Sequence, residues 1–203
     1  MNKIILSGTL VDKPSLSHEV REQKFYSFML SSKRKSDKTD VLPCIVSEAL
    51  VDEIAKHEKI KIAGEVRTRN IYIGEKRKLD IYVFVREVVE HDGDDENNVK
   101  LNGFICKTPI YRVTPRKIEI TDFMVSSNRG YGKPDYIPCI AWNENSRKVT
   151  HMWFGTEINL IGRLQSREYN KKLDNGAIEK RIAYELSVSR VDEVEVVNDA
   201  SEN

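Results

Sequence analysis

The 203-residue sequence lacks the features that mark several large classes of protein. It has no apolar run near the ~20 residues that a membrane helix needs, and strand-like sequence from Lys3 leaves no room for a signal peptide, so we expect a cytoplasmic protein. Its three cysteines, Cys44, Cys106 and Cys139, are an odd number without CxxC spacing, which predicts neither a disulfide framework nor a zinc site. Cys44 and Cys139 lie in apolar strand sequence and are expected to be core residues.

Residues suited to catalysis are also few. The four histidines are scattered, without a repeated neighbourhood of acids or nucleophiles: His18, His57, His91 and His151. A nuclease would need clustered carboxylates to hold metal ions, whereas the acids here lie mostly in a linker and a tail. We therefore expect no enzyme, no catalytic or metal-binding residues and no cofactor.

Charge is sorted along the chain. Lys and Arg outnumber Asp and Glu by 4 in residues 1–89 and by 7 in residues 99–191, whereas residues 90–98 and the last twelve residues each hold 5 acids and no base. This pattern predicts two basic domains, 1–90 and 99–191, with a solvated acidic linker over 91–98 and an acidic tail over 192–203.

The sequence repeats itself at about half its length. FMLSSKRKSDKTDVLPCIVSEA from Phe28 matches FMVSSNRGYGKPDYIPCIAWNE from Phe123, and Gly8 aligns with Gly103 at the same offset of 95. Later segments align at offsets of 98 and 103, so the insertions fall in loops, as two copies of one fold would show.

Hydrophobic periodicity predicts five strands in the first copy, at residues 3–12, 20–32, 41–47, 59–73 and 78–88. Helical spacing in EALVDEIAKH places one helix between the third and fourth strands. That order is typical of the OB-fold, so we predict an all-β protein with two tandem five-stranded OB-fold barrels. In the second copy Trp153 has helical spacing with Val149 and Met152 and is expected in the core.

Alternate residues of a strand share a face, which separates the outward side chains of the second copy from its core. In DYIPCIAWN the inward set is Ile137, Cys139 and Ala141, and the outward set is Tyr136, Pro138, Ile140 and Trp142. In INLIGRLQSREY the outward set is Arg163, Gln165, Arg167 and Tyr169. Because rings stack on unpaired bases and arginines contact phosphates, this surface indicates single-stranded nucleic acid; the alternative is packing against the other repeat or a second subunit.

These stretches resemble the bacterial single-stranded DNA-binding protein family, above all LNGFICKTP, DYIPCIAW and GRLQSREY with AYELSVSRVDE. The resemblance covers residues 3–90 and 99–194 and is closer in the second copy. It implies non-catalytic, largely sequence-independent binding of single-stranded DNA in replication, recombination or repair. It also implies an assembly of four OB-folds, which for a tandem chain is a homodimer.

Members of this family stack bases on aromatic side chains at four places, which the resemblance assigns in the second copy to Tyr131, Tyr136, Trp142 and Tyr169. The same places in the first copy hold Ser36, Val41, Ser47 and Ile71. We therefore expect the main nucleic-acid site in residues 99–191, with basic contacts from Arg129, Lys133, Arg163, Arg167, Lys171 and Lys172. The first domain should add mainly charge, through Lys33, Arg34, Lys35, Lys38, Arg67 and Arg69.

Two further features concern protein partners. Strand alternation directs Tyr82 and Phe84 outward, and exposed aromatics there suggest a protein interface. The tail VDEVEVVNDASEN lacks the apolar tip with which typical family members recruit replication enzymes, so recruitment through the tail is not expected. The alternatives are an interaction scaffold of a primosome or replication complex with weak DNA contact, and binding of single-stranded RNA, since stacking does not read the 2′-hydroxyl.

Overall fold

The computed structural model describes residues 1–74, 76–91, 93–130, 132–173 and 176–194. Its first domain contains β1 (Asn2–Leu10), β2 (Ser15–Val20), β3 (Gln23–Lys33), β4 (Thr39–Ser47), α1 (Glu48–Ala55), β5 (Lys59–Ile73) and β6 (Lys76–Val89). Its second domain repeats this order with β7 (Asn97–Ile105), β8 (Ile110–Val113), β9 (Glu119–Asn128), β10 (Pro134–Trp142), α2 (Asn143–Thr150), β11 (Glu157–Lys172) and β12 (Ile178–Glu193).

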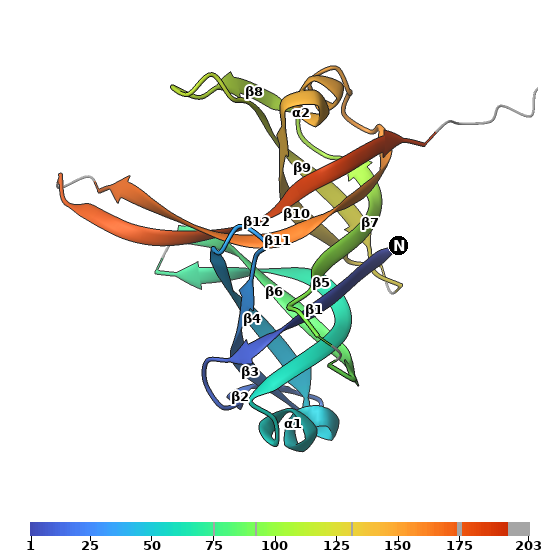
Figure 1. Ribbon diagram of the computed structural model, residues 1–203, viewed down its shortest axis with the longest axis vertical. Helices are drawn as coiled ribbons and strands as arrows, with labels where there is room; N and C mark the ends of the chain where they lie inside the picture. Colours follow the sequence, from blue (N-terminus) through green and yellow to red (C-terminus); the bar gives the residue numbers. More distant parts are fainter. Residues whose placement is uncertain (75, 92, 131, 174–175, 195–203) are drawn as a thin grey trace, which may run out of the picture.

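Each domain is a closed barrel with one helix between its β4–β5 or β10–β11 strands, which confirms the predicted OB-fold (Figure 1). Closure comes from the short pairings β1–β3 and β7–β9 in addition to the main strand order. Each domain has one strand more than predicted, because β2 and β8 pair with the outer edge of β3 and β9. In the first domain Arg21 and Glu22 adopt positive φ angles in the turn between β2 and β3. The predicted segment 20–32 included this turn and most of β3 but left out β2 before Val20.

Barrel closure explains the glycine shared by the two copies. A Cβ atom added to Gly8 would lie 2.1 Å from the Ser31 carbonyl oxygen, and one added to Gly103 would lie 2.4 Å from that of Ser126. These positions are where the first and third strands of each domain approach closely. Any other residue would push the backbones apart at the point where the barrel closes.

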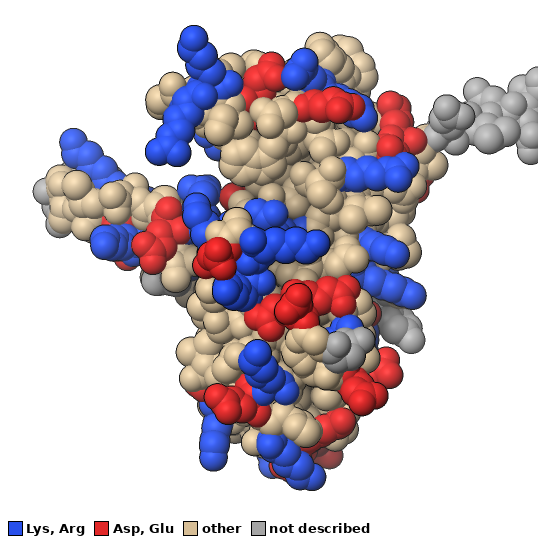
Figure 2. All heavy atoms as spheres, viewed as in Figure 1, with Lys and Arg blue, Asp and Glu red and all other residues tan. Residues whose placement is uncertain are grey.

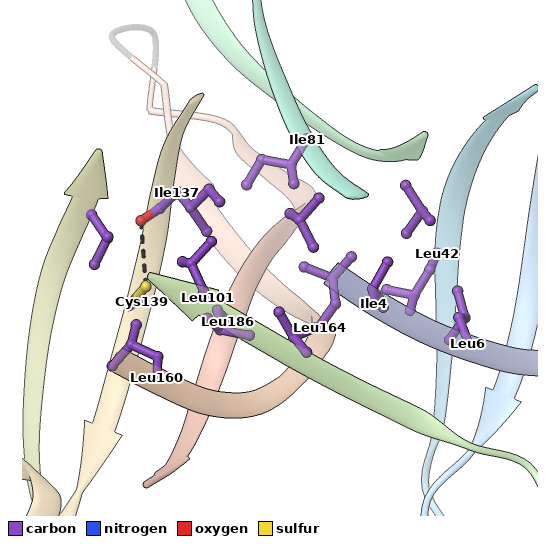
Figure 3. Close-up of a cluster of buried hydrophobic side chains, with 14 of the residues drawn as sticks. Ile4, Leu6, Leu42, Ile81, Leu101, Ile137, Cys139, Leu160, Leu164 and Leu186 are labelled. Atoms are coloured by element: carbon purple, nitrogen blue, oxygen red, sulfur yellow. Dashed lines mark hydrogen bonds between the residues drawn. The ribbon is translucent and has the colours of Figure 1, made fainter. Parts of the chain in front are cut away.

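The two barrels are joined along their first strands. β1 and β7 pair antiparallel from Asn2↔Leu101 to Leu6↔Asn97, so the twelve strands form one continuous sheet order. Buried side chains of both domains belong to one hydrophobic cluster, part of which Figure 3 shows: Ile4, Leu6, Leu42 and Ile81 from the first domain, and Leu101, Ile137, Cys139, Leu160, Leu164 and Leu186 from the second. The domains are therefore fixed against each other by both backbone pairing and a shared core.

The predicted solvated linker over 91–98 is wrong in its second half. Asn97 and Asn98 already belong to β7 and pair with β1. Just before them, Glu96 exchanges hydrogen bonds with Ser7, accepting from the Ser7 amide at 2.7 Å and donating its own amide to the Ser7 hydroxyl at 2.5 Å. Charge and composition could not predict these contacts, because they depend on the pairing of β1 with β7, which places the connection against the first domain.

Strand alternation correctly predicts the barrel interior, and the helix that follows is shorter than its spacing suggests. Ile137, Cys139 and Ala141 are buried, as is Cys44. However, α2 ends at Thr150, so Trp153 lies in a turn in which it exchanges hydrogen bonds with Thr156. Trp153 is 82% exposed, and its assignment to the core is wrong.

None of the helices described is long and apolar enough to cross a membrane.

Candidate nucleic-acid interface

Two buried carboxylates hold the domains in register, one on each side. Asp40, at the start of β4, accepts hydrogen bonds from Arg34 at 2.6 Å and from the Ser166 amide of the other domain at 2.8 Å. In turn the Val41 amide donates to the Ser166 hydroxyl at 3.3 Å. Since the side chain of Asp40 is fully buried, these bonds must compensate for the loss of its hydration.

The second carboxylate repeats this arrangement with the domains exchanged. Asp135, at the offset of 95 from Asp40, accepts from Arg129 at 2.7 Å and from the Thr68 amide of the first domain at 2.6 Å. The Arg129 guanidinium also donates to the Thr68 carbonyl at 2.8 Å. Arg34 and Arg129, both predicted as phosphate contacts, therefore act as anchors between the domains, and their pairing raises the pKa of each guanidinium.

A groove of about 770 Å³ lies between the domains on the side of Asp40. One wall comes from the β3–β4 region of the first domain and the other from β10, β11 and β12 of the second. Its side chains include Arg34, Lys38, Arg163 and Arg167 with the aromatics Trp142 and Tyr184. Figure 2 shows basic side chains gathered at the level where the β11–β12 hairpin meets the first domain. The groove can therefore offer rings and cations to one ligand.

Trp142 is the aromatic side chain at the centre of this surface. It lies at the end of β10, is partly exposed, and donates from its indole nitrogen to the Ser187 hydroxyl at 3.2 Å. Ser187 is the register partner of Ile140, which is 2% exposed. Ile140 is outside the core cluster, as predicted, but its side chain is buried and not exposed to solvent.

Arg163 is a cation of this groove that keeps an unpaired donor among the residues described. Its guanidinium donates to Gln165 at 3.2 Å, while its buried Nε atom has no hydrogen-bond partner among the residues described. Burial, and then repulsion by Arg34, lower the pKa of Arg163. A partly buried cation without a carboxylate partner favours an incoming anion.

The β11–β12 hairpin extends the surface beyond the barrel (Figure 1). Tyr169 is 37% exposed, with the Arg167 guanidinium 5.9 Å from its ring centre. Lys171 and Lys172, further along β11, are exposed. Arg167 also pairs with Glu185 at 3.2 Å, and Glu185 accepts from Gln165 at 2.9 Å. Gln165, predicted outward, is therefore buried.

The remaining predicted positions of the second domain lie elsewhere. Tyr136 is 42% exposed and its amide donates to the Thr68 hydroxyl, so it lies at the Asp135 side and does not line the groove that contains Trp142. Lys133 is exposed in the β9–β10 loop, also on the Asp135 side. Tyr131 lies outside the described residues. Sequence analysis missed Tyr184, because its strand neighbours gave no aromatic pattern; only the fold brings it into the groove that Trp142 also lines.

In the first domain the corresponding surface is covered by its own side chains. The Arg67 guanidinium lies 3.9 Å and that of Arg86 4.8 Å from the centre of the Phe84 ring, and the Phe25 ring lies 6.0 Å away. Tyr82 is 9% exposed. The prediction that Tyr82 and Phe84 form an exposed interface is therefore wrong for Tyr82, and Phe84 is half-buried beneath arginines.

Most predicted cations of the first domain are paired with carboxylates. Lys33 pairs with Asp37 at 3.0 Å, and Arg69 pairs with Asp80 at 2.9 Å. The connection between the domains adds acids, since Asp95 accepts from the Lys33 amide at 2.7 Å and Glu96 pairs with Lys61 at 3.2 Å. Of the other predicted cations, Lys35 lines a cavity beside this connection, and Lys38 lines the groove with Trp142.

Residues 96–194 match the single-strand binding protein family. The second domain belongs to this family. A stretch of 83 residues is 31% identical to single-stranded DNA-binding proteins 1 and 2 of Staphylococcus aureus strains COL and MSSA476, covering 37% of this chain and 50% of each relative. The chain thus spans about half the length of the curated relatives that it matches.

Solved structures extend the similarity in fold to the whole chain. The wild-type single-stranded DNA binding protein of Thermus aquaticus superposes with a TM-score of 0.77 at 17% identity, over 100% of this chain and 97% of that one. A deletion mutant of the same protein gives 0.73 at 18% identity, over 99% and 98%. Both OB-fold domains of this chain therefore have counterparts in the fold of one solved structure.

Proposed function

We propose that this protein binds single-stranded DNA without catalysis and with little sequence preference, in replication, recombination or repair. The observation that carries the proposal is the groove in which Trp142 and Tyr184 lie beside Arg34, Lys38, Arg163 and Arg167. Rings that stack on bases and cations that meet phosphates are the means by which proteins bind unpaired strands. Family membership of the second domain and the printed function of the Staphylococcus relatives support the same conclusion.

The groove includes residues of both domains, so the main site is not confined to the second domain. Trp142 and Arg163 come from the second domain, whereas Arg34 and Lys38 come from the first. A strand that stacks on Trp142 would therefore also contact the β3–β4 loop. We propose that the first domain contributes to the main site through this loop, with Tyr169, Lys171 and Lys172 continuing the path along the hairpin.

The proposed role also implies a cytoplasmic location, where bacterial DNA is copied, and an assembly of two chains with four OB-folds. We expect sedimentation to give twice the mass of 23.4 kDa. A monomer at all concentrations would contradict the assembly and leave the DNA-binding proposal standing.

Replacing Trp142 and Tyr169 with alanine tests the DNA-binding proposal. Since each stacked base contributes about 1–3 kcal/mol, the double variant should bind an oligothymidine at least 30-fold or so more weakly. Trp153→Ala is the matched control, because Trp153 is exposed and does not line the groove. An interaction scaffold with weak DNA contact predicts instead that both variants bind alike, and parallel titration with oligouridine separates DNA from RNA preference.

A further inference from the structure

A second cavity between the domains, of about 550 Å³, lies on the side of Asp135. Its walls are β5 and β6 of the first domain and the β9–β10 loop of the second. Four cations line it, Arg67, Arg86, Arg129 and Lys133, against the two carboxylates Glu65 and Asp135. Asp135 accepts hydrogen bonds from Arg129 and the Thr68 amide. Glu65 is therefore the carboxylate that neutralises Arg67 and Arg86.

Glu65 bridges the two arginines of the first domain. One carboxylate oxygen accepts from Arg67 at 3.0 and 2.8 Å, and the other accepts from Arg86 at 3.0 Å. Burial opposes ionisation of Glu65, yet the hydrogen bonds and charges of Arg86 and Arg67 lower its pKa on balance. Both guanidiniums also lie on the Phe84 ring, which gives each a second contact besides the carboxylate.

The internal repeat shows what the same position does in the other half. At the offset of 98, Glu65 corresponds to Arg163, which lies on the equivalent strand and faces the equivalent loop of the opposite domain. Arg163 lacks an ion pair with a carboxylate among the residues described, whereas Glu65 holds two arginines. The two interdomain surfaces are thus related by the repeat but carry opposite charge at this one position.

We propose that the cavity lined by Arg67, Arg86 and Lys133 is a second phosphate-binding site and that the Glu65 carboxylate holds it closed. This inference rests on the proposed DNA binding, since the ligand would be a backbone phosphate of the same strand. A carboxylate bridging two guanidiniums uses the donors that a phosphodiester oxygen pair would use. The closed site explains why the first domain keeps many arginines and still presents little free positive charge.

Glu65→Gln in the full-length chain tests the proposal, because it removes the charge and keeps the shape. Binding of a fluorescein-labelled oligothymidine is measured by anisotropy across a potassium chloride series, both in the wild-type background and in Trp142→Ala/Tyr169→Ala. In the latter background the variant should bind about fivefold to tenfold more tightly at low salt. Its salt dependence should steepen by about 0.7 in log–log slope for each phosphate gained.

Two controls separate this site from a general charge effect. Glu87→Gln removes the same charge from an exposed position of β6 and should change affinity less than about twofold. Adding Arg86→Gln to Glu65→Gln should abolish the gain. Equal effects of the Glu65 and Glu87 variants, or no gain in either background, would overturn the closed site. Undiminished binding by the double alanine variant would instead refute the stacking proposal, so the two failures are distinguishable.

Discussion

The first and second domains share one scaffold and differ in what they present to solvent. Both close their barrels at a glycine, both place a buried aspartate at the start of the fourth strand, and both bind that aspartate to the other domain. The surfaces beside these aspartates differ: Trp142 and Arg163 line an open groove, whereas Phe84 lies under Arg67 and Arg86. The repeat has therefore kept its assembly and changed its binding face.

The aromatic residues of the two domains occupy the same region from different strands. In the second domain Trp142 comes from β10 and reaches Ser187 on β12. In the first domain Ser47 holds the position of Trp142, and Phe84 on β6 holds that of Ser187. Each arrangement buries one outward isoleucine, Ile140 or Ile45, to 2–3% exposure. The first domain has thus retained the apolar cover of this face and lost the ring that a base could reach.

Removing the buried aspartates tests whether Asp40 and Asp135 stabilise the contact between the domains equally. Asp135→Ala and Asp40→Ala should each lower the free energy of unfolding by about 3 kcal/mol, because each strands a guanidinium and a backbone amide of the other domain. Urea denaturation measures both, with Glu87→Ala as the exposed control. A large loss for only one aspartate would show that the two domain contacts are not equivalent.

Truncating Phe84 and Trp142 tests how the binding faces of the two domains differ. Phe84→Ala should destabilise the protein by about 2 kcal/mol, below the range for a fully buried phenylalanine because Phe84 is half-buried. It should change oligothymidine affinity less than about threefold, whereas Trp142→Ala should lower both stability and affinity. Urea denaturation and anisotropy of the same variants give the comparison. An affinity loss for Phe84→Ala as large as for Trp142→Ala would show that the first domain also stacks bases.

The fold could be predicted from the sequence because the strands obey local rules. The predicted segment 59–73 is β5, and residues 41–47 fall within β4, since alternation and turn residues define both. The additional strand β8 escaped prediction because it is exposed along its whole length and so lacks an alternating pattern. β2 is exposed at both of its ends and also lacks alternation.

The candidate site could be predicted only in its residue types. Trp142, Arg163, Arg167 and Tyr169 lie along one surface, as their outward spacing indicated. The contacts between domains could not be foreseen from the sequence. The pairing of Arg34 with Asp40 is local, but Asp40 also accepts a hydrogen bond from Ser166, which is 126 residues further along the chain. For the same reason the sequence could not show that Arg67 is neutralised and Arg163 is not.

The smallest expected effect concerns the pH dependence of Glu65, whose counterpart in the second domain is the oppositely charged Arg163. Its pKa in the folded protein lies below the ordinary value of 4.5, so its ionisation stabilises the fold above that value, and this contribution is lost as pH falls through the folded pKa. Wild type should exceed Glu65→Gln in unfolding free energy by at most about 1 kcal/mol at neutral pH, since the side chains are partly exposed. Urea denaturation of the two proteins from neutral pH into the acid range isolates this group, because every other titrating residue is common to both. If the difference persisted unchanged at acid pH, the stabilisation would come from the shape of the side chain, and the contrast in charge between Glu65 and Arg163 would have no consequence for folding.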